Sequence, residues 1–188
     1  MFRTPRVSVF GATSPDQFHG VGMEVTFDIR GLYDKALAES QIDGARWSMS
    51  DDATMRMSMA AIADGWQGPL NLRAYHPSLW IFEESDLAPA VDFLARRVRE
   101  MVIPTLAQLT SLRSVCDALD TRPLTASPFF KGWTNYSVPL LFEMCGHPSL
   151  HSVVAEMDAF WTQQPRDTWG TSEMQAFLTR VRQRNGLR

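Results

Sequence analysis

Three residues in the last third of the chain combine donor types that bind zinc. Cys145, His147 and His151 fall within two turns of a helix, and thiolate and imidazole are common zinc ligands. A closed zinc site needs about four ligands, and a catalytic site needs about three that converge. The sequence equally fits a structural interpretation, in which Cys145 is a small buried residue and His147 forms a turn with Pro148. Cys145, His147 and His151 are therefore candidate metal ligands, and the structural interpretation is the alternative. We predict no cofactor.

An acid–base pair is the second chemical possibility. His76 lies at the predicted end of a strand, and Glu83 and Glu84 follow it closely. A histidine beside a carboxylate can move protons in a hydrolase. Carboxylates in this position also suit the start of a helix, where the helix dipole favours negative charge. The chain contains no Gly-x-Ser-x-Gly elbow, so the sequence favours a protein without catalytic activity.

The segment from Leu124 to Tyr136 is a candidate for contact with another protein. Its aromatic residues are Phe129, Phe130, Trp133 and Tyr136. Exposed aromatic side chains on loops are typical anchors of protein interfaces. The segment can instead fold back and fill the core, and the sequence leaves both alternatives open.

Two further surfaces are predicted to contact a partner. The first is an acidic edge formed by Glu83, Glu84 and Asp86. The second, a lesser candidate, is the surroundings of either of two single tryptophans that each lie beside a glycine in a predicted turn, Trp66 and Trp169.

The spacing of apolar residues indicates which elements position these groups. Before residue 85, apolar and polar residues mostly alternate, as they do from Met23 to Ile29, and turn residues separate the runs. This pattern predicts four to five short strands of an antiparallel sheet. One such strand is expected from Thr54 to Ala61, with Met55, Met57 and Met59 on one face.

From residue 85 onward, the apolar residues recur at helical spacing. We expect Asp86 to cap a first helix and Pro104 to end it. The predicted buried face of this helix consists of Leu87, Val91, Leu94, Val98 and Met101. Further helices bring the total to about five in residues 85–188. Strands followed by helices predict an α+β fold, with the helices packed on the sheet of residues 1–84 in a single domain, 1–188.

The composition argues against several function classes. The chain has 188 residues, 45% of them hydrophobic, and a formal net charge of −3, which gives no overall field to attract nucleic acid or an anionic membrane. No apolar run approaches the ~18 residues that a membrane helix needs. Cys116 and Cys145 fall in apolar helical patterns, which indicates buried thiols in a reducing compartment and not a disulfide framework. We expect a cytoplasmic protein.

Three short motifs follow one another along the chain. They are the strand Val25-Thr26-Phe27-Asp28-Ile29, a strand ending near Trp80, and the joint Ile103-Pro104-Thr105-Leu106 after a long helix. In this order they resemble the bacterial domain-of-unknown-function family 4304, over roughly residues 7–161. The resemblance implies a fold and a bacterial setting without an established activity. Proteins of this size and pattern also resemble immunity proteins, which neutralise a toxin by binding it.

The sequence therefore predicts a non-catalytic bacterial protein that binds another protein. Its most concrete form is an immunity protein that binds one toxin molecule. Two alternatives stay open: a small hydrolase that uses His76 and a nearby carboxylate, and a homo-oligomeric structural protein. Nucleic acid and membrane are not expected as partners.

Overall fold

A computed structural model describes residues 6–13, 19–29, 31–32, 35, 38–39, 54–57, 59–71, 78–129, 136–165 and 170–187. The chain separates into two compact units that interleave in sequence. Unit 1 comprises Met1–Arg3, Asp28–Met55 and Thr110–Arg188, and unit 2 comprises Thr4–Phe27 and Arg56–Leu109. The prediction of one domain over residues 1–188 stays a prediction.

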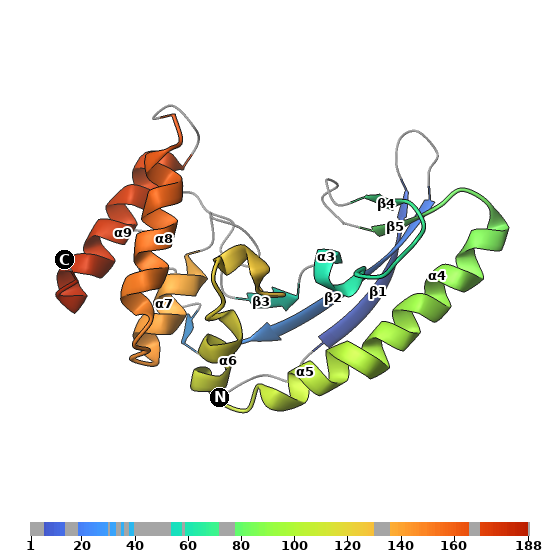
Figure 1. Cartoon of the computed structure of the whole chain (residues 1–188), viewed down its shortest axis with the longest axis horizontal. Helices are drawn as coiled ribbons and strands as arrows, with labels where there is room; N and C mark the ends of the chain where they lie inside the picture. Colours follow the sequence, from blue (N-terminus) through green and yellow to red (C-terminus); the bar gives the residue numbers. More distant parts are fainter. Residues whose placement is uncertain are drawn as a thin grey trace. The chain divides into compact units, whose positions relative to one another are not determined.

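The longest strand pairing in unit 2 joins β1 (Arg6–Thr13) to β2 (His19–Asp28), as Figure 1 shows. The two strands are antiparallel along the whole of β1, from Arg6 opposite Thr26 to Thr13 opposite His19. In β2, Met23 and Val25 are buried, as the predicted alternation requires of these two residues. Such alternation is typical of a sheet with one face in the core.

Shorter strands complete the described pairings. β5 (Ser78–Ile81) is antiparallel to the start of β2 and to β4 (Leu70–Asn71), and β3 (Thr54–Met57) also pairs with β2. The predicted mixed class, with antiparallel strands followed by helices, is confirmed. The predicted number of strands stays a prediction.

One long helical run accompanies these strands in unit 2. α4 (Glu84–Arg97) contacts β5 and continues through a π-helical turn, η1 (Val98–Val102), into α5 (Ile103–Gln108) (Figure 1). The prediction that Pro104 ends this helix is wrong. In η1 the Ile103 N–H bonds to the Val98 carbonyl, five residues earlier. Because this wider turn shifts the hydrogen bonds immediately before Pro104, the missing N–H of the proline falls at the first turn of α5, where it is tolerated.

The buried face of α4 also differs from the predicted one. Leu94 is buried as predicted, but its buried neighbours are Ala90 and Phe93, whereas Leu87 and Val91 are each 45% exposed. Both sets have helical spacing, so the spacing alone did not identify the face that meets the sheet.

A short helix replaces the second half of the strand predicted from Thr54 to Ala61. α3 (Met59–Ile62) begins just after β3, and its first and last residues are buried. Arg97 of α4 donates from Nε to the Ile62 carbonyl and from Nη2 to the Ala61 carbonyl, each at 2.8 Å. These bonds satisfy carbonyls at the end of α3 and fix α3 against α4.

We expect Arg97→Met to weaken the attachment of α3. Hydrogen bonds from a charged donor contribute about 1.5–3 kcal/mol, so the free energy of opening of the α3 amides should fall by a similar amount. Native-state hydrogen exchange read by mass spectrometry measures this change. The matched control is Arg99→Met, because Arg99 is exposed on the same helical run. Equal effects of the two substitutions would contradict the assignment.

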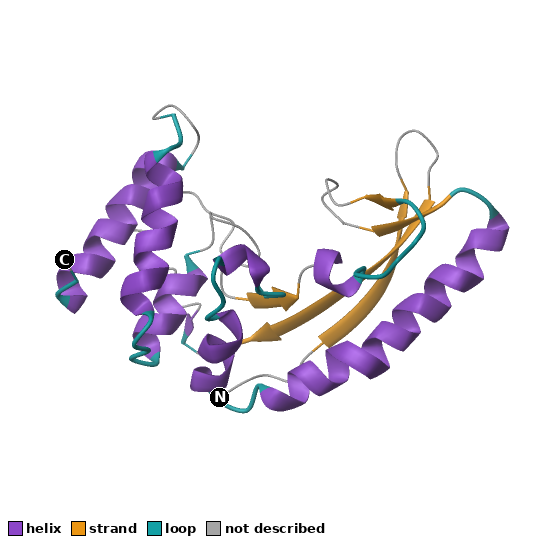
Figure 2. Cartoon of the chain, in the orientation of Figure 1, coloured by secondary structure: helices purple, strands orange, loops and turns teal. Residues whose placement is uncertain are grey.

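The described part of unit 1 is mostly helical (Figure 2). α6 (Leu112–Leu119), α7 (Ser137–Met144), α8 (Leu150–Thr162) and α9 (Thr171–Asn185) each contact the next in sequence. A short 3-10 turn, η2 (Leu124–Ala126), follows α6. Their packed core includes Val115, Leu119, Leu141, Phe142, Val153, Met157, Phe177, Leu178 and Val181. No helix among the described residues is long and apolar enough to span a membrane.

A cluster of charged residues holds α9 to other parts of unit 1. Arg184 of α9 pairs with Glu143 of α7 and with Glu39, and Lys35 also pairs with Glu143. Burial by itself would raise the pKa of Glu143, but hydrogen bonds from Arg184, Lys35 and Asn185 outweigh it and lower the pKa to about 2. At least one arginine at the end of the chain therefore has a structural role.

Glu143 should make the stability of unit 1 depend on acid. Its pKa falls from 4.5 to about 2 on folding, so its contribution is present above the higher value and is lost as the pH falls through the lower one. We expect Glu143→Gln to reduce stability at neutral pH and to flatten its decline between about pH 5 and pH 2. Urea denaturation at a series of pH values measures both effects.

Glu100→Gln is the matched control, because Glu100 is an exposed carboxylate of unit 2. A Glu143→Gln variant with the same pH dependence as the unaltered chain would contradict the prediction.

Candidate functional site

The exposed large apolar side chains of the described residues all belong to unit 2. They are Leu70, Phe82, Leu87, Val91 and Ile103, with exposed fractions between 37% and 55%. Single exposed apolar residues are ordinary, whereas several close together on a surface mark sites of interaction. Three of these residues lie just before α4 (Phe82) or in its first half (Leu87 and Val91).

We call the surface formed by Phe82, Leu87 and Val91 the α4 apolar surface. Leu87 and Val91 are four residues apart and lie on the same side of the helix. Phe82 precedes the N-cap, and Leu87 is the fourth helical residue. An apolar pair in these two positions commonly packs together at the entry of a helix. These positions predict that the three apolar side chains lie near one another, and the Phe82 ring also meets the Trp80 ring edge to face, with centroids 5.6 Å apart.

Backbone capping fixes the start of α4. The helix begins at Glu84 with Glu83 as its N-cap, so the prediction of Asp86 as the N-cap is wrong. The Asp86 carboxylate instead accepts hydrogen bonds from the N–H groups of Phe82 and Glu83, each at 3.0 Å. This is the reciprocal half of a capping box, in which the third helical residue reaches back. Glu83 and Glu84 remain exposed, so an acidic edge borders the α4 apolar surface.

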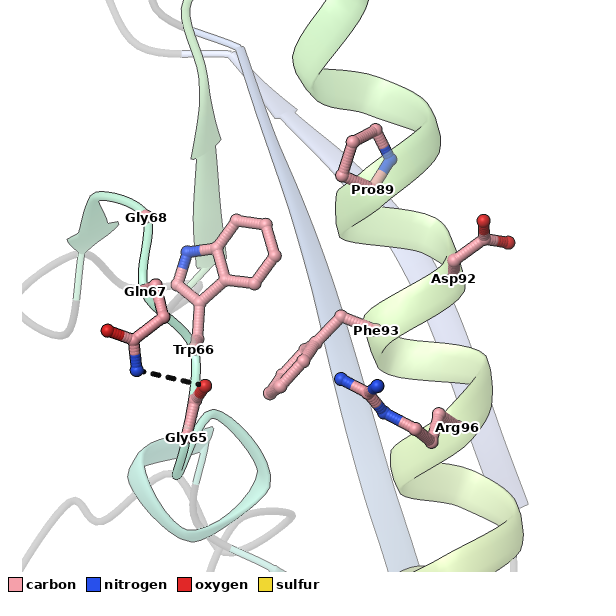
Figure 3. Close-up of a pocket in the computed structure, with 8 residues that line it drawn as sticks. All are labelled: Gly65, Trp66, Gln67, Gly68, Pro89, Asp92, Phe93 and Arg96. Atoms are coloured by element: carbon pink, nitrogen blue, oxygen red, sulfur yellow. Dashed lines mark hydrogen bonds between the residues drawn. The ribbon is translucent and has the colours of Figure 1, made fainter.

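A cleft of about 380 Å³ lies between α4 and the turn that follows α3 (Figure 3). Its lining consists of Gly65, Trp66, Gln67, Gly68, Pro89, Asp92, Phe93 and Arg96. The ring centroids of Trp66 and Phe93 are 5.1 Å apart, and the Arg96 guanidinium lies 5.6 Å from the centroid of the Phe93 ring. An aromatic wall with an adjacent cation is suited to binding, and the Asp92 carboxylate adds a negative charge to the lining.

Glycine allows Trp66 to lie over its own turn. Gly65 has a φ of +84°, which side chains rarely adopt. A Cβ on Gly68 would come within 2.7 Å of the Trp66 indole, and the indole N–H donates to the Pro69 carbonyl at 3.2 Å. Trp66 therefore helps to form the cleft, and its predicted contact with a partner stays a prediction.

The cleft and the α4 apolar surface lie on opposite sides of the buried face of α4. With about 100° between successive helical residues, Asp92 and Arg96 lie on one flank of the face that contains Phe93, and Leu87 and Val91 lie on the other. The two surfaces are therefore separate candidate sites.

Two of the four aromatic residues predicted on the loop are core residues. Phe129 is 1% exposed and Tyr136 is 3% exposed. The rings of Tyr136 and Phe177 meet edge to face, with centroids 4.5 Å apart. The alternative in which this segment fills the core therefore applies to Phe129 and Tyr136, and neither side chain is available to a partner in this structure. Phe130 and Trp133 lie outside the described residues, and their role stays a prediction.

The predicted metal ligands do not converge. No group of three or more His, Cys, Asp or Glu that could hold a metal ion occurs among the described residues, which include Cys145, His147 and His151. The His147 Nε2 lies 3.0 Å from the Asp117 Oδ1, and its Nδ1 accepts the Ser149 N–H at 3.1 Å. Because Nδ1 is an acceptor, Nε2 carries the hydrogen and donates to Asp117. His147 thus joins α6 to the turn before α8. Cys145, which the structural interpretation of the sequence expected to be buried, is only partly buried because it lies at the end of α7.

The structure places the two cysteines close together, which the sequence did not predict. The Sγ atoms of Cys116, on α6, and Cys145, at the end of α7, are 2.8 Å apart, and both thiols are free. The two positions are 29 residues apart, and they form none of the short cysteine motifs that a sequence reveals. Only the packing of α6 on α7 brings them together.

His76 lies outside the described residues, as does Trp169. The proposed carboxylate partners Glu83 and Glu84 are exposed at the start of α4. The hydrolase alternative therefore stays a prediction.

The comparisons found no similar protein. No family model, no curated protein and no solved structure matches the chain. The resemblance to family 4304 stays a prediction.

The pair between His147 and Asp117 yields a measurable electrostatic effect. The hydrogen bond from His147 is the largest cause of a lowered pKa of Asp117, and Arg113 makes a smaller contribution. We expect His147→Ala to raise the pKa of the Asp117 carboxyl toward its usual range by more than Arg113→Ala does. Carbon-13 NMR titration of the Asp117 side chain measures both shifts. A larger shift in the Arg113 variant would contradict this order.

Proposed function

We propose that this chain binds another protein through the α4 apolar surface. The observation that carries the proposal is the exposure of Phe82, Leu87 and Val91, which are 45% to 50% exposed at one end of a well-capped helix. A different face of the same helix anchors it to unit 2, and this face consists of Ala90, Phe93 and Leu94.

Burial of these side chains by a partner would be favourable. Removing a large apolar side chain from water contributes about 1.5–3 kcal/mol, and part of that energy is still available at each half-exposed residue. The capping box and the bonds from Arg97 to α3 hold the helix in place before binding. A preformed surface loses less conformational entropy on association than a flexible one.

The charge around this surface favours a partner with a basic rim. Glu83 and Glu84 are exposed beside Phe82, and the whole chain has a formal net charge of −3. Complementary charges at the edge of an interface accelerate association and select the partner more than they increase affinity. The proposed occupant is therefore a protein with apolar side chains surrounded by lysine or arginine.

In a bacterial cytoplasm, the most specific form of this proposal is an immunity protein that blocks a toxin one to one. The resemblance to small immunity proteins supports this form, as does a rigid binding surface. Phe130 and Trp133 remain a second proposed contact with the same partner.

We expect the double variant Leu87→Asp/Val91→Asp to lose partner binding. Two charges introduced at the centre of an apolar contact should weaken Kd by roughly 100-fold or more. Affinity capture with the tagged chain, followed by mass spectrometry, identifies the partner, and titration calorimetry with the purified partner measures the loss. The melting temperature should change little, because both positions are half-exposed.

The matched control is Ala155→Asp, an apolar-to-acidic change at an exposed position of α8 in unit 1. This variant should retain the partner. Binding unaffected by Leu87→Asp/Val91→Asp would show that the partner uses another surface, and a parallel Trp133→Ala bait tests the loop. Self-association that is lost in the double variant, measured by light scattering, would instead support the homo-oligomer alternative.

A further inference from the structure

The thiols of Cys116 and Cys145 are close enough to react with each other. Their Sγ atoms are 2.8 Å apart, while the sulfurs of a disulfide are about 2.05 Å apart. Each thiol also lies 3.6 Å from a carbonyl of α7, Leu141 for Cys116 and Phe142 for Cys145. These contacts hold both sulfurs in the space between α6 and the end of α7.

The two sulfurs differ in their access to solvent. Cys116 is fully buried, whereas Cys145 is partly exposed at the C-cap of α7 and is followed by the exposed Gly146. Burial, and then the hydrogen bond with Cys145, raise the pKa of the Cys116 thiol. Cys116 therefore stays protonated until its neighbour has reacted, and an oxidant from solution meets Cys145 first.

The residues around the thiols argue against a metal at this place. The nearest imidazole in sequence, His147, has both ring nitrogens engaged by Asp117 and Ser149. Among the described residues no third ligand joins these thiols in a possible metal site. Two thiols alone do not hold zinc, but they are sufficient for a redox couple.

We propose that Cys116 and Cys145 form a reversible intramolecular disulfide, which makes unit 1 responsive to the thiol–disulfide balance of its surroundings. The proposed oxidant is a small-molecule disulfide of the glutathione class. This inference is independent of the partner proposed for the α4 apolar surface.

The reaction proceeds by two exchanges. The Cys145 thiol loses its proton to water, and its sulfur attacks one sulfur of the oxidant, which gives a mixed disulfide and one small thiolate. That thiolate takes the proton of Cys116, whose sulfur then attacks Cys145 and releases the second small thiolate. The leaving thiolate is protonated by water, so the chain loses two hydrogens and two electrons, and the oxidant becomes two thiols.

The bond would close a loop that carries part of the core. Leu124, Phe129 and Tyr136 lie between the two cysteines and are buried. A crosslink between residues 29 positions apart restricts the unfolded chain more than a short-range crosslink does. Since α6 and α7 already contact each other, oxidation should stabilise unit 1 without a rearrangement of its helices.

The test is to equilibrate the full chain with glutathione at a series of oxidised-to-reduced ratios. After acid quenching and alkylation of free thiols, peptide mapping by mass spectrometry should show Cys116 linked to Cys145 within one chain. Both thiols should lose their reactivity together. The melting temperature should rise by roughly 5–15 °C and return on treatment with dithiothreitol.

Two single variants separate the roles of the sulfurs. Cys116→Ser should accumulate a mixed disulfide with glutathione at Cys145, whereas Cys145→Ser should leave the buried Cys116 unmodified. The proposal is overturned if both thiols of the unaltered chain stay alkylatable in excess oxidised glutathione. A crosslink between two chains, or a stable mixed disulfide in the unaltered chain, would overturn it equally.

Discussion

A helix can bury only one side against a sheet, and α4 carries apolar side chains on two. Ala90, Phe93 and Leu94 take the buried side, and Arg97 extends it by binding the last carbonyls of α3. Because this side of α4 is the buried one, Phe93 contacts the turn that carries Trp66. For the same reason Leu87 and Val91 remain half-exposed. The surface proposed for partner binding is thus a direct result of how the helix is anchored.

Polar contacts have a comparable role in unit 1, where they connect helices that are distant in sequence. His147 joins α6 to the start of α8 through Asp117 and Ser149, and Glu143 joins α7 to α9 through Arg184. The two thiols lie between α6 and α7, within this frame. The sulfurs therefore meet because the polar contacts and the apolar core fix both helices, and a reaction between them needs little movement.

Local signals were sufficient to predict α7, α8 and α9 of unit 1. In α7, the apolar spacing agrees with a helix that ends before Gly146, whose φ is +59°. The same signals predicted the helix α4 but not its whole buried face or its continuation, because two apolar stripes were compatible with its spacing and because a π-helical turn accommodates Pro104. The proximity of Cys116 and Cys145 was also beyond sequence reasoning, since it depends on how α6 and α7 pack. The loop residues Phe129 and Tyr136 fitted both a surface and a core position, and only the structure distinguishes these.

The interleaved order of the two units constrains how the chain can fold during synthesis. All of unit 2 lies before Thr110, so its strands and α4 can assemble while the last helices are still missing. Unit 1 contains Lys35 and Glu39, whose charged partners Glu143 and Arg184 are made last. Lys35 and Glu39 therefore remain without these charged partners until the helices that carry Glu143 and Arg184 have been synthesised, after unit 2. Unit 1 therefore depends on contacts between segments far apart in sequence, and contacts of this kind are typical of slow folding.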